Sequence, residues 1–255
     1  MYFFYNYLNK RLGSIFAATA DKIALSMPEA VSKTRCPLDR PNVVGIFHVP
    51  EESIDQGNNY LQGLDAVEFR LDLLERLPHR SELEIYRRPL IMTARHSEEG
   101  GNPHLNQEQR LQLLTEAMPL ASFVDLELRF WNEAVSEMAR KSDVRVIASF
   151  HDFSATPHLS ELLEKSHQAK QLGADVFKVA THLTGPNDLA CLLQLLAAAP
   201  IPVAAMGMGP LGMASRLALA HCGSVLNYGW LGRPFIAGQW SAKKFAERLK
   251  ELGHS

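Results

Sequence analysis

The chain has 255 residues, 46% of them hydrophobic, which is enough for one large α/β domain or two small ones. Its formal charge of −2 shows no basic excess of the kind that neutralises phosphates, so we expect a small molecule or a protein as the partner and no nucleic acid. Three cysteines without metal-ligand spacing favour a reducing compartment such as the cytoplasm and no metal site, and no apolar run is long enough to span a membrane.

Residues 1–41 form a predicted N-terminal extension and connector ahead of the main domain. Residues 1–20 contain no acidic residue and carry Lys10 and Arg11 behind an aromatic cluster, which weakly resembles a targeting segment. Polar residues interrupt the apolar part of this stretch, so an ordinary amphipathic leader is an equal alternative. Residues 22–40 predict a short strand or hairpin followed by a connector.

From residue 42 to residue 255, strand-like and helix-like patterns alternate. The strands are short apolar runs, and the helices carry apolar residues at helical spacing, several of them closed by a glycine. The predicted strands are residues 43–49, 66–73, 89–94, 123–128, 144–150, 175–180, 201–206 and 224–228. The predicted helices are residues 53–63, 81–86, 106–117, 132–140, 159–172, 186–198, 211–221 and 241–252.

This alternation predicts an α/β fold, a (β/α)8 TIM barrel that forms a single domain over residues 42–255. No linker rich in proline, glycine or serine interrupts it, and no internal repeat is visible. A doubly wound open sheet is the structural alternative. In a barrel, alternate residues of each strand point inward, and active sites lie at the C-terminal ends of the strands.

The second and fourth predicted strands each carry charged residues on one face and apolar residues on the other. The charged sets are Glu68, Arg70 and Asp72, and Asp125, Glu127 and Arg129. Buried ions need partners, so several inward charges indicate a polar site inside the barrel. Structural ion pairs at solvent-facing strand ends are the alternative, and they account best for Asp72 and Arg129.

Lys178 lies inside the otherwise apolar sixth strand, residues 175–180. Lysine is rarely buried, because removing an ammonium group from water is costly. Desolvation would lower the pKa of Lys178 and leave a neutral amine that can attack a carbonyl group and form a Schiff base. The alternative is a lysine whose head group reaches solvent or pairs with a carboxylate.

Other candidate residues follow the neighbouring strands. Arg95 ends the third strand, and the glycine-containing loop behind it can bring Glu99 back over the barrel mouth. His151 ends the fifth strand, and a histidine there is a candidate general acid or base because its ordinary pKa lies near working pH. A histidine that is only hydrogen-bonded is the alternative, which the adjacent Lys178 disfavours.

The stretch after the seventh strand contains G-x-G-x-x-G, a pattern typical of dinucleotide binding. No acidic residue follows between Gly212 and Glu247 to bind a ribose, so we interpret the match as coincidental. Met206 and Met208 face the same way and can form an apolar wall. Arg216, in the next helix, suits a substrate carboxylate because its planar guanidinium binds two oxygens at once.

Gln239 follows the eighth strand in a loop where its amide can reach a ligand. These residues together resemble type I 3-dehydroquinate dehydratase, in the right order and over the chain from residue 42 onward. The matching motifs are Glu68-x-Arg70, the stretch 95–101, Asp125-x-Glu127, His151-Asp152-Phe153, Phe177-Lys178-Val179-Ala180, Met206-x-Met208 with Arg216, and Gly238-Gln239. No single motif is specific, but the set is.

The resemblance implies a TIM-barrel lyase of the shikimate pathway of aromatic amino acid biosynthesis, commonly a homodimer, that uses no metal or nucleotide cofactor. Its substrate would be 3-dehydroquinate and its product 3-dehydroshikimate. Lys178 would form an imine with the C3 ketone, His151 would move the protons, and Glu99 would orient His151. The substrate-binding residues would be Glu68, Arg70, Arg95, Arg216, Gln239, Met206, Met208 and Phe235.

The chain departs from this family at two positions. Phe235-Ile236-Ala237 stands where the family usually has Ser-Ala-Pro with a serine that touches the substrate, and Tyr228 stands where phenylalanine is usual. We expect the first departure to affect affinity rather than chemistry. Two other functions stay open: a class I aldolase or transaldolase relative that binds a sugar phosphate, and a barrel that binds dehydroquinate without turning it over.

Overall fold

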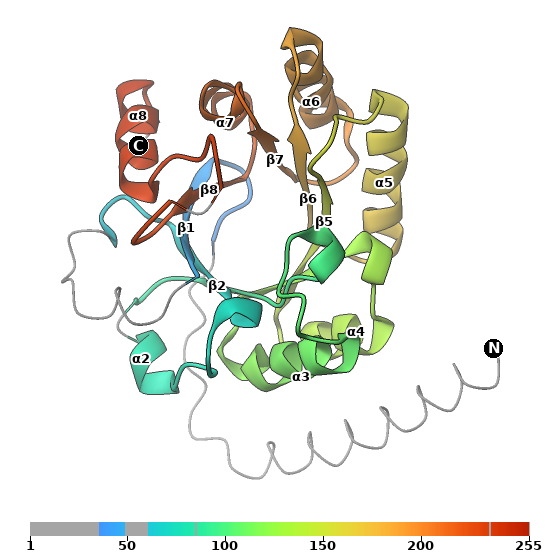
Figure 1. Cartoon of the computed structure of the whole chain (residues 1–255), viewed down its shortest axis with the longest axis vertical. Helices are drawn as coiled ribbons and strands as arrows, with labels where there is room; N and C mark the ends of the chain where they lie inside the picture. The colour runs from blue at the N-terminus through green and yellow to red at the C-terminus, as the bar shows by residue number, and fades with distance from the viewer. Residues whose placement is uncertain (1–35, 49–60, 85, 235, 255) are drawn as a thin grey trace. The chain divides into compact units, whose positions relative to one another are not determined.

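The computed structural model describes residues 36–48, 61–84, 86–234 and 236–254, and these residues form a (β/α)8 barrel (Figure 1). The predicted fold class is therefore confirmed. Most of the predicted extension, most of the helix predicted at 53–63, and Phe235 lie outside the described residues.

The strands in the described part of the chain are all parallel, in the order β7-β6-β5-β4-β3-β2-β1-β8. They are β1 Asn42–Phe47, β2 Ala66–Arg70, β3 Leu90–Thr93, β4 Phe123–Glu127, β5 Arg145–Asp152, β6 Val176–His182, β7 Val203–Met208 and β8 Leu226–Trp230. The ring closes between β7 and β8, where Val225 donates its N–H to the carbonyl of Val203 at 2.9 Å. Ser224 Oγ also accepts the N–H of Ala205 at 3.0 Å.

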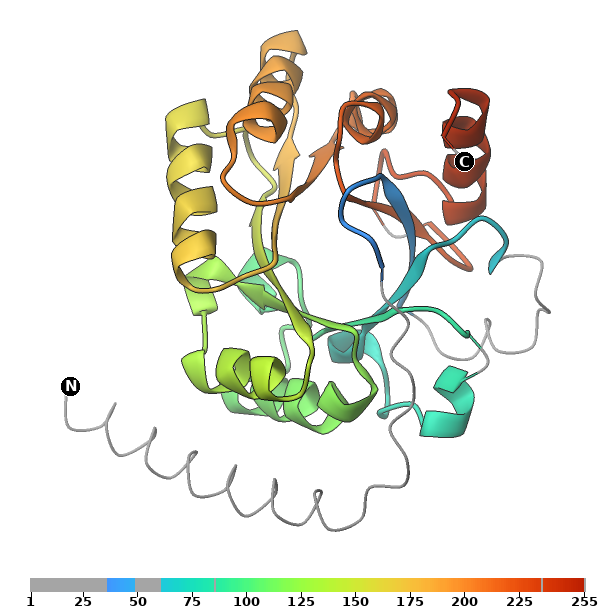
Figure 2. The same ribbon diagram turned by 180° about the vertical axis from the view of Figure 1, so that it is seen from behind.

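The helices surround these strands, as the view from behind shows (Figure 2). The α-helices are α2 Arg80–Glu84, α3 Gln107–Ala117, α4 Glu133–Lys141, α5 Leu159–Gln171, α6 Pro186–Ala198, α7 Gly212–His221 and α8 Ala242–Glu251. Short 3₁₀ turns are η2 Leu71–Leu73, η3 Ser97–Glu99, η4 Met118–Leu120 and η5 Leu128–Phe130. Side chains that accept a backbone N–H set three helix starts, because they satisfy donors that lack an intrahelical partner: Asn106, Asn132 and Ser241.

Alternation along the strands separates two apolar layers. Val67 and Phe69 of β2 belong to the layer between strands and helices, whereas Ile91 of β3 and Ile147 of β5 belong to the barrel interior. The charged neighbours of Val67 and Phe69 on β2 therefore point inward, as the alternation predicts. This arrangement brings charged side chains from several strands into one enclosed space.

Some element ends differ from the prediction. The second strand ends at Arg70, because Asp72 turns back in η2 and accepts two hydrogen bonds from Arg70 at 2.9 and 2.8 Å. Asp72 is also buried, so its assignment to a solvent-facing ion pair was wrong. Arg129 does form an exposed ion pair, with Glu98 at 3.0 Å. By contrast, β5 is longer at its C-terminal end than predicted, since it ends at Asp152 and the predicted strand ended at residue 150.

Candidate active site

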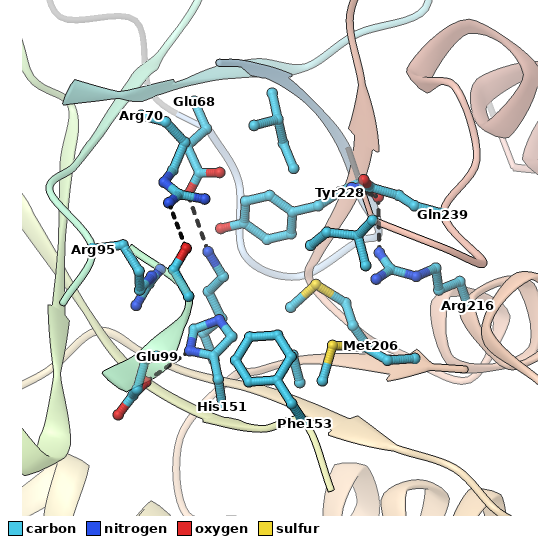
Figure 3. Close-up of a pocket in the computed structure, with 16 residues that line it drawn as sticks. Glu68, Arg70, Arg95, Glu99, His151, Phe153, Met206, Arg216, Tyr228 and Gln239 are labelled. Atoms are coloured by element: carbon cyan, nitrogen blue, oxygen red, sulfur yellow. Dashed lines mark hydrogen bonds and ion pairs between the residues drawn. The ribbon is translucent and has the colours of Figure 1, made fainter. Parts of the chain in front are cut away.

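A cavity of about 200 Å³ lies inside the barrel at the C-terminal ends of the strands (Figure 3). It gathers ten of the eleven residues predicted to act in catalysis or substrate binding, and the eleventh, Phe235, lies outside the described residues. The ten are Glu68, Arg70, Arg95, Glu99, His151, Lys178, Met206, Met208, Arg216 and Gln239. They come from β2, β5, β6 and β7 and from the loops and helices that follow the strands.

Lys178 lies on β6 with only 5% of its side chain exposed, and it lines this cavity. Its Nζ lies 3.0 Å from Glu68 Oε1 and 2.9 Å from Asp125 Oδ2. It also lies 4.0 Å from the ring centroid of Tyr228. Pairing with carboxylates was the alternative interpretation of this lysine, and the structure shows both features together: an ion-paired head group and a place in the cavity wall.

Arg95 shares the carboxylate of Asp125 with Lys178 and links β4 to β5. It donates hydrogen bonds to Asp125 at 2.8 Å and to Ser149 at 2.6 Å, and its Nη1 lies 3.4 Å from Glu127. Burial opposes the charged form of Arg95, but Asp125 and Glu127 nevertheless raise its pKa. Burial likewise opposes ionisation of Asp125, yet Arg95 and Lys178 lower its pKa. Both groups are therefore ionised at neutral pH.

His151 and Glu99 form a second pair at the edge of the cavity, with His151 Nδ1 2.8 Å from Glu99 Oε2. Glu99 ends η3, and the left-handed backbone of Gly100, with a φ of 82°, closes that turn. The loop thus returns over the barrel mouth as the sequence predicts. Burial lowers the pKa of His151 well below its usual range, and the positive charges of Arg95 and Lys178 add to this effect.

Burial raises the pKa of Glu99 from 4.5 to about 7, because its carboxyl group is almost fully removed from water. The folded protein therefore binds this proton more tightly than the unfolded chain does. The contribution of the carboxyl group to stability is complete below about pH 4.5 and is lost as the pH rises through about 7.

We expect Glu99→Gln to gain stability relative to the parent chain as the pH rises over this window. With 1.36 kcal/mol per pKa unit, the gain in the free energy of unfolding should reach about 3 kcal/mol above pH 7. Urea unfolding at a series of pH values measures it. Glu98→Gln is the control, since Glu98 is half exposed and does not line the cavity, and the loss of its exposed ion pair should cost at most about 1 kcal/mol. A constant difference for Glu99→Gln would contradict the prediction.

Arg216 lies on α7 with its guanidinium buried on the far side of the cavity from Arg70 (Figure 3). It donates to the carbonyls of Gly207 at 3.1 Å and Tyr228 at 3.0 Å. Among the described residues no carboxylate pairs with it, and burial lowers its pKa to about 10. Its remaining N–H groups are available to an anion in the cavity.

The neighbours of Arg216 give that side of the cavity a mixed surface. Met206 and Met208 are buried residues of the barrel interior and form the apolar wall that their spacing predicts. Gln239 donates to the carbonyl of Tyr228 at 3.3 Å, and its Oε1 accepts no hydrogen bond from a described residue. An amide oxygen and a guanidinium therefore remain for a bound molecule.

Six lining residues received no site role from the sequence: Ile46, Gly100, Phe153, Ala180, Tyr228 and Ile236. Phe153 is 49% exposed at the rim, with its ring centroid 6.3 Å from that of His151. Ile46 and Tyr228 belong to the interior layer. Alternation along β1 and β8 places both side chains inside the barrel. Neither carries a charge, so neither stood out among the candidate site residues.

No cluster of three or more potential metal ligands occurs among residues 36–48, 61–84, 86–234 and 236–254. In the same ranges, no helix is both long and apolar enough to cross a bilayer.

A family profile described as type I 3-dehydroquinase matches residues 47–255. The chain belongs to the type I 3-dehydroquinase family. It is therefore an enzyme of the hydro-lyase class. The profile begins in β1 and covers every strand and loop that contributes to the cavity after Ile46.

Curated relatives within this family are similar over most of their length. A 3-dehydroquinate dehydratase of Methanococcus maripaludis strain C7 is 32% identical over 79% of this chain and 94% of the relative. One from Methanocaldococcus jannaschii is also 32% identical, with the same two coverages. This type I 3-dehydroquinase family member thus spans nearly the whole length of both relatives.

Solved structures of the family share the fold. The type I 3-dehydroquinate dehydratase of Clostridium difficile is 25% identical, with a TM-score of 0.71 over 89% of this chain and 98% of that one. The Aquifex aeolicus 3-dehydroquinate dehydratase, at 24% identity, has a TM-score of 0.72 over 84% of this chain and 100% of that one. This family member therefore has the same barrel fold as these two solved structures.

Proposed function

We propose that this chain dehydrates 3-dehydroquinate to 3-dehydroshikimate in the shikimate pathway, through a Schiff base on Lys178. The observation that carries the proposal is a buried lysine whose amine borders the cavity between two carboxylates. A buried amine of this kind suits reaction with a ketone. The Clostridium difficile relative has been solved with covalent modified comenic acid, which supports a covalent route.

In the first step, the Lys178 ammonium group transfers a proton to His151 Nε2, Nζ attacks the C3 carbonyl carbon, and one Nζ proton moves to the carbonyl oxygen to give a carbinolamine. His151 then donates a proton to the carbinolamine oxygen, which leaves as water, so that the lysine becomes a protonated imine. The imine is positively charged like the ammonium it replaces, and Glu68 and Asp125 continue to neutralise it at hydrogen-bond distance. The charge balance of the barrel interior is thus preserved during the covalent step.

The imine makes the C2 hydrogen acidic, because the electrons of the broken C–H bond move toward the nitrogen. His151 is the base for this proton, since its depressed pKa keeps it neutral at working pH. The enamine then expels the C1 hydroxyl group, which takes a proton from His151 and leaves as water. Hydrolysis of the conjugated imine releases the product and restores Lys178.

Glu99 supports His151 both as a proton acceptor and as a proton donor. Nδ1 of His151 faces Glu99, so Nε2 is left for the substrate. A carboxyl group with a pKa of about 7 can accept a hydrogen bond from Nδ1–H or donate one to Nδ1. Nε2 can accordingly act as a proton acceptor in one step and as a donor in the next.

The carboxylate of the substrate binds Arg216, whose buried charge has no carboxylate partner among the described residues. We expect Arg216→Met to raise KM by about 100-fold, because a buried charge-assisted contact contributes about 2–5 kcal/mol. The value of kcat should change far less, since the reacting atoms lie elsewhere. Arg248→Met is the control, because Arg248 is exposed and pairs with Glu251, three residues further along the chain. A KM within about threefold of the parent value would contradict carboxylate binding by Arg216.

One part of the proposal depends on the departure from the family at Phe235-Ile236-Ala237. Phe235 takes the place of a serine that touches substrate in the family, and it lies outside the described residues, whereas its neighbour Ile236 lines the cavity. Phe235 would contribute apolar contact to the bound substrate in place of a hydrogen bond. We also propose, from the family resemblance, a homodimer in the cytoplasm that uses no cofactor.

The test is incubation with 3-dehydroquinate and borohydride, followed by peptide mass analysis, while the absorbance of the conjugated product is followed in parallel. An adduct on Lys178 together with product supports both mechanism and substrate. An adduct without product favours the barrel that binds without turnover. No adduct and no product would contradict the proposal and favour the sugar-phosphate alternative.

A further inference from the structure

Tyr228 on β8 extends across the cavity from Arg216 toward Glu68 and Arg70. Its backbone carbonyl accepts the hydrogen bond of Arg216 at 3.0 Å, and its ring lies beneath Lys178. Figure 3 shows the phenol directed away from Arg216, toward the side of the cavity where Glu68 and Arg70 lie. The side chain is 1% exposed and lines the cavity.

The phenol oxygen of Tyr228 has no hydrogen-bond partner among the described residues. A buried hydroxyl group without a partner costs about 1–3 kcal/mol. A phenylalanine ring would pack against the Lys178 amine in the same way and would avoid this cost. Packing therefore does not account for the oxygen.

The surroundings of the phenol fit a hydroxylated ligand. Burial and the negative charges of Glu68 and Asp125 raise the pKa of Tyr228 well above its usual range, so the phenol keeps its proton and can donate it to a hydrogen bond. The adjacent wall offers Glu68 as an acceptor and Arg70 as a donor. These groups match a ring that carries several hydroxyls at the end opposite its carboxylate.

We propose that the Tyr228 hydroxyl group is an additional specificity-determining hydrogen-bond donor to a ring hydroxyl of the substrate, on the side of Glu68 and Arg70. The proposal rests on the function proposed above and deepens it.

The experiment compares the parent chain with Tyr228→Phe. We expect KM for 3-dehydroquinate to rise about tenfold, the equivalent of one hydrogen bond of about 1.4 kcal/mol, with kcat within about threefold. The melting temperature of the free protein should stay the same or rise, because the variant removes an unpartnered buried hydroxyl group. Tyr86→Phe is the control, since Tyr86 lies in the outer apolar layer, and its KM should match that of the parent chain.

Two analogues of 3-dehydroquinate, one without the C4 hydroxyl and one without the C5 hydroxyl, make the test specific. The difference between parent chain and Tyr228→Phe should disappear for one analogue and persist for the other. An unchanged KM, a loss of melting temperature, or equal differences with both analogues would overturn the inference. Absence of product from the parent chain would contradict the proposed function and the inference with it, whereas equal KM values in two active proteins contradict the inference alone.

Discussion

Lys178→Met is expected to lose turnover by at least about 10⁴-fold and to give no borohydride adduct, because the variant has no amine to form the imine. Methionine keeps most of the side-chain volume, so the cavity wall stays filled. Initial rates and intact mass after borohydride treatment measure both effects. A variant that is still labelled in a substrate-dependent way would remove Lys178 from the mechanism.

Lys178→Met is expected to fold. Removing one partner of a buried ion pair costs about 3–5 kcal/mol when the other charge is left alone. Here both carboxylates keep a second partner: Glu68 accepts from Thr93 at 2.8 Å, and Asp125 remains paired with Arg95. The loss of stability should therefore be smaller, with an unchanged circular dichroism spectrum. Lys141→Met is the control, since 74% of the Lys141 side chain is exposed.

The second large effect is expected for His151→Ala, with kcat lowered by about 10³-fold because proton transfer must then go through water. The adduct on Lys178 should still form, more slowly, since the attacking amine and its carboxylate partners are intact. Lys178→Met should lose both adduct and product, whereas His151→Ala should keep the adduct and lose most of the product. The two variants thus separate the nucleophile from the base.

His167→Ala is the control for this variant, because His167 is exposed on α5 and its Nδ1 lies 2.8 Å from the carbonyl of Leu163 in the same helix. Its rate and its labelling should equal those of the parent chain. Full activity in His151→Ala would exclude His151 as the base. A complete absence of adduct would instead place His151 in the nucleophilic step alone.

The fold could be predicted because its signal is local. Runs such as Val176 to Ala180 have the length and composition of buried parallel strands, and their alternation with helices leaves few architectures. Element ends were less predictable, because they depend on contacts distant in sequence. The second strand stops at Arg70 because Asp72 also accepts the N–H of Arg95, and no pattern within residues 66–73 reveals that partner.

The members of the site could be predicted from charged residues in apolar strands, whereas their partners could not. Lys178 stands out within its own strand, but its two carboxylates lie 110 and 53 residues away along the chain. The expectation of an unpaired amine arose from reading one strand at a time. Tyr228 was visible as a family departure, yet only the structure shows that its hydroxyl group is buried without a partner among the described residues.

The ion pairs around Arg95 carry a consequence for how such a chain can change over generations. One guanidinium contacts both acidic residues of β4 and the serine of β5, so the loss of Arg95 removes a cationic partner from two buried carboxylates at once. A population screened only for survival of heat could replace these groups in matched sets by apolar residues. A population selected for growth that depends on the enzyme's product could not make these replacements. They would also remove the charges that flank Lys178.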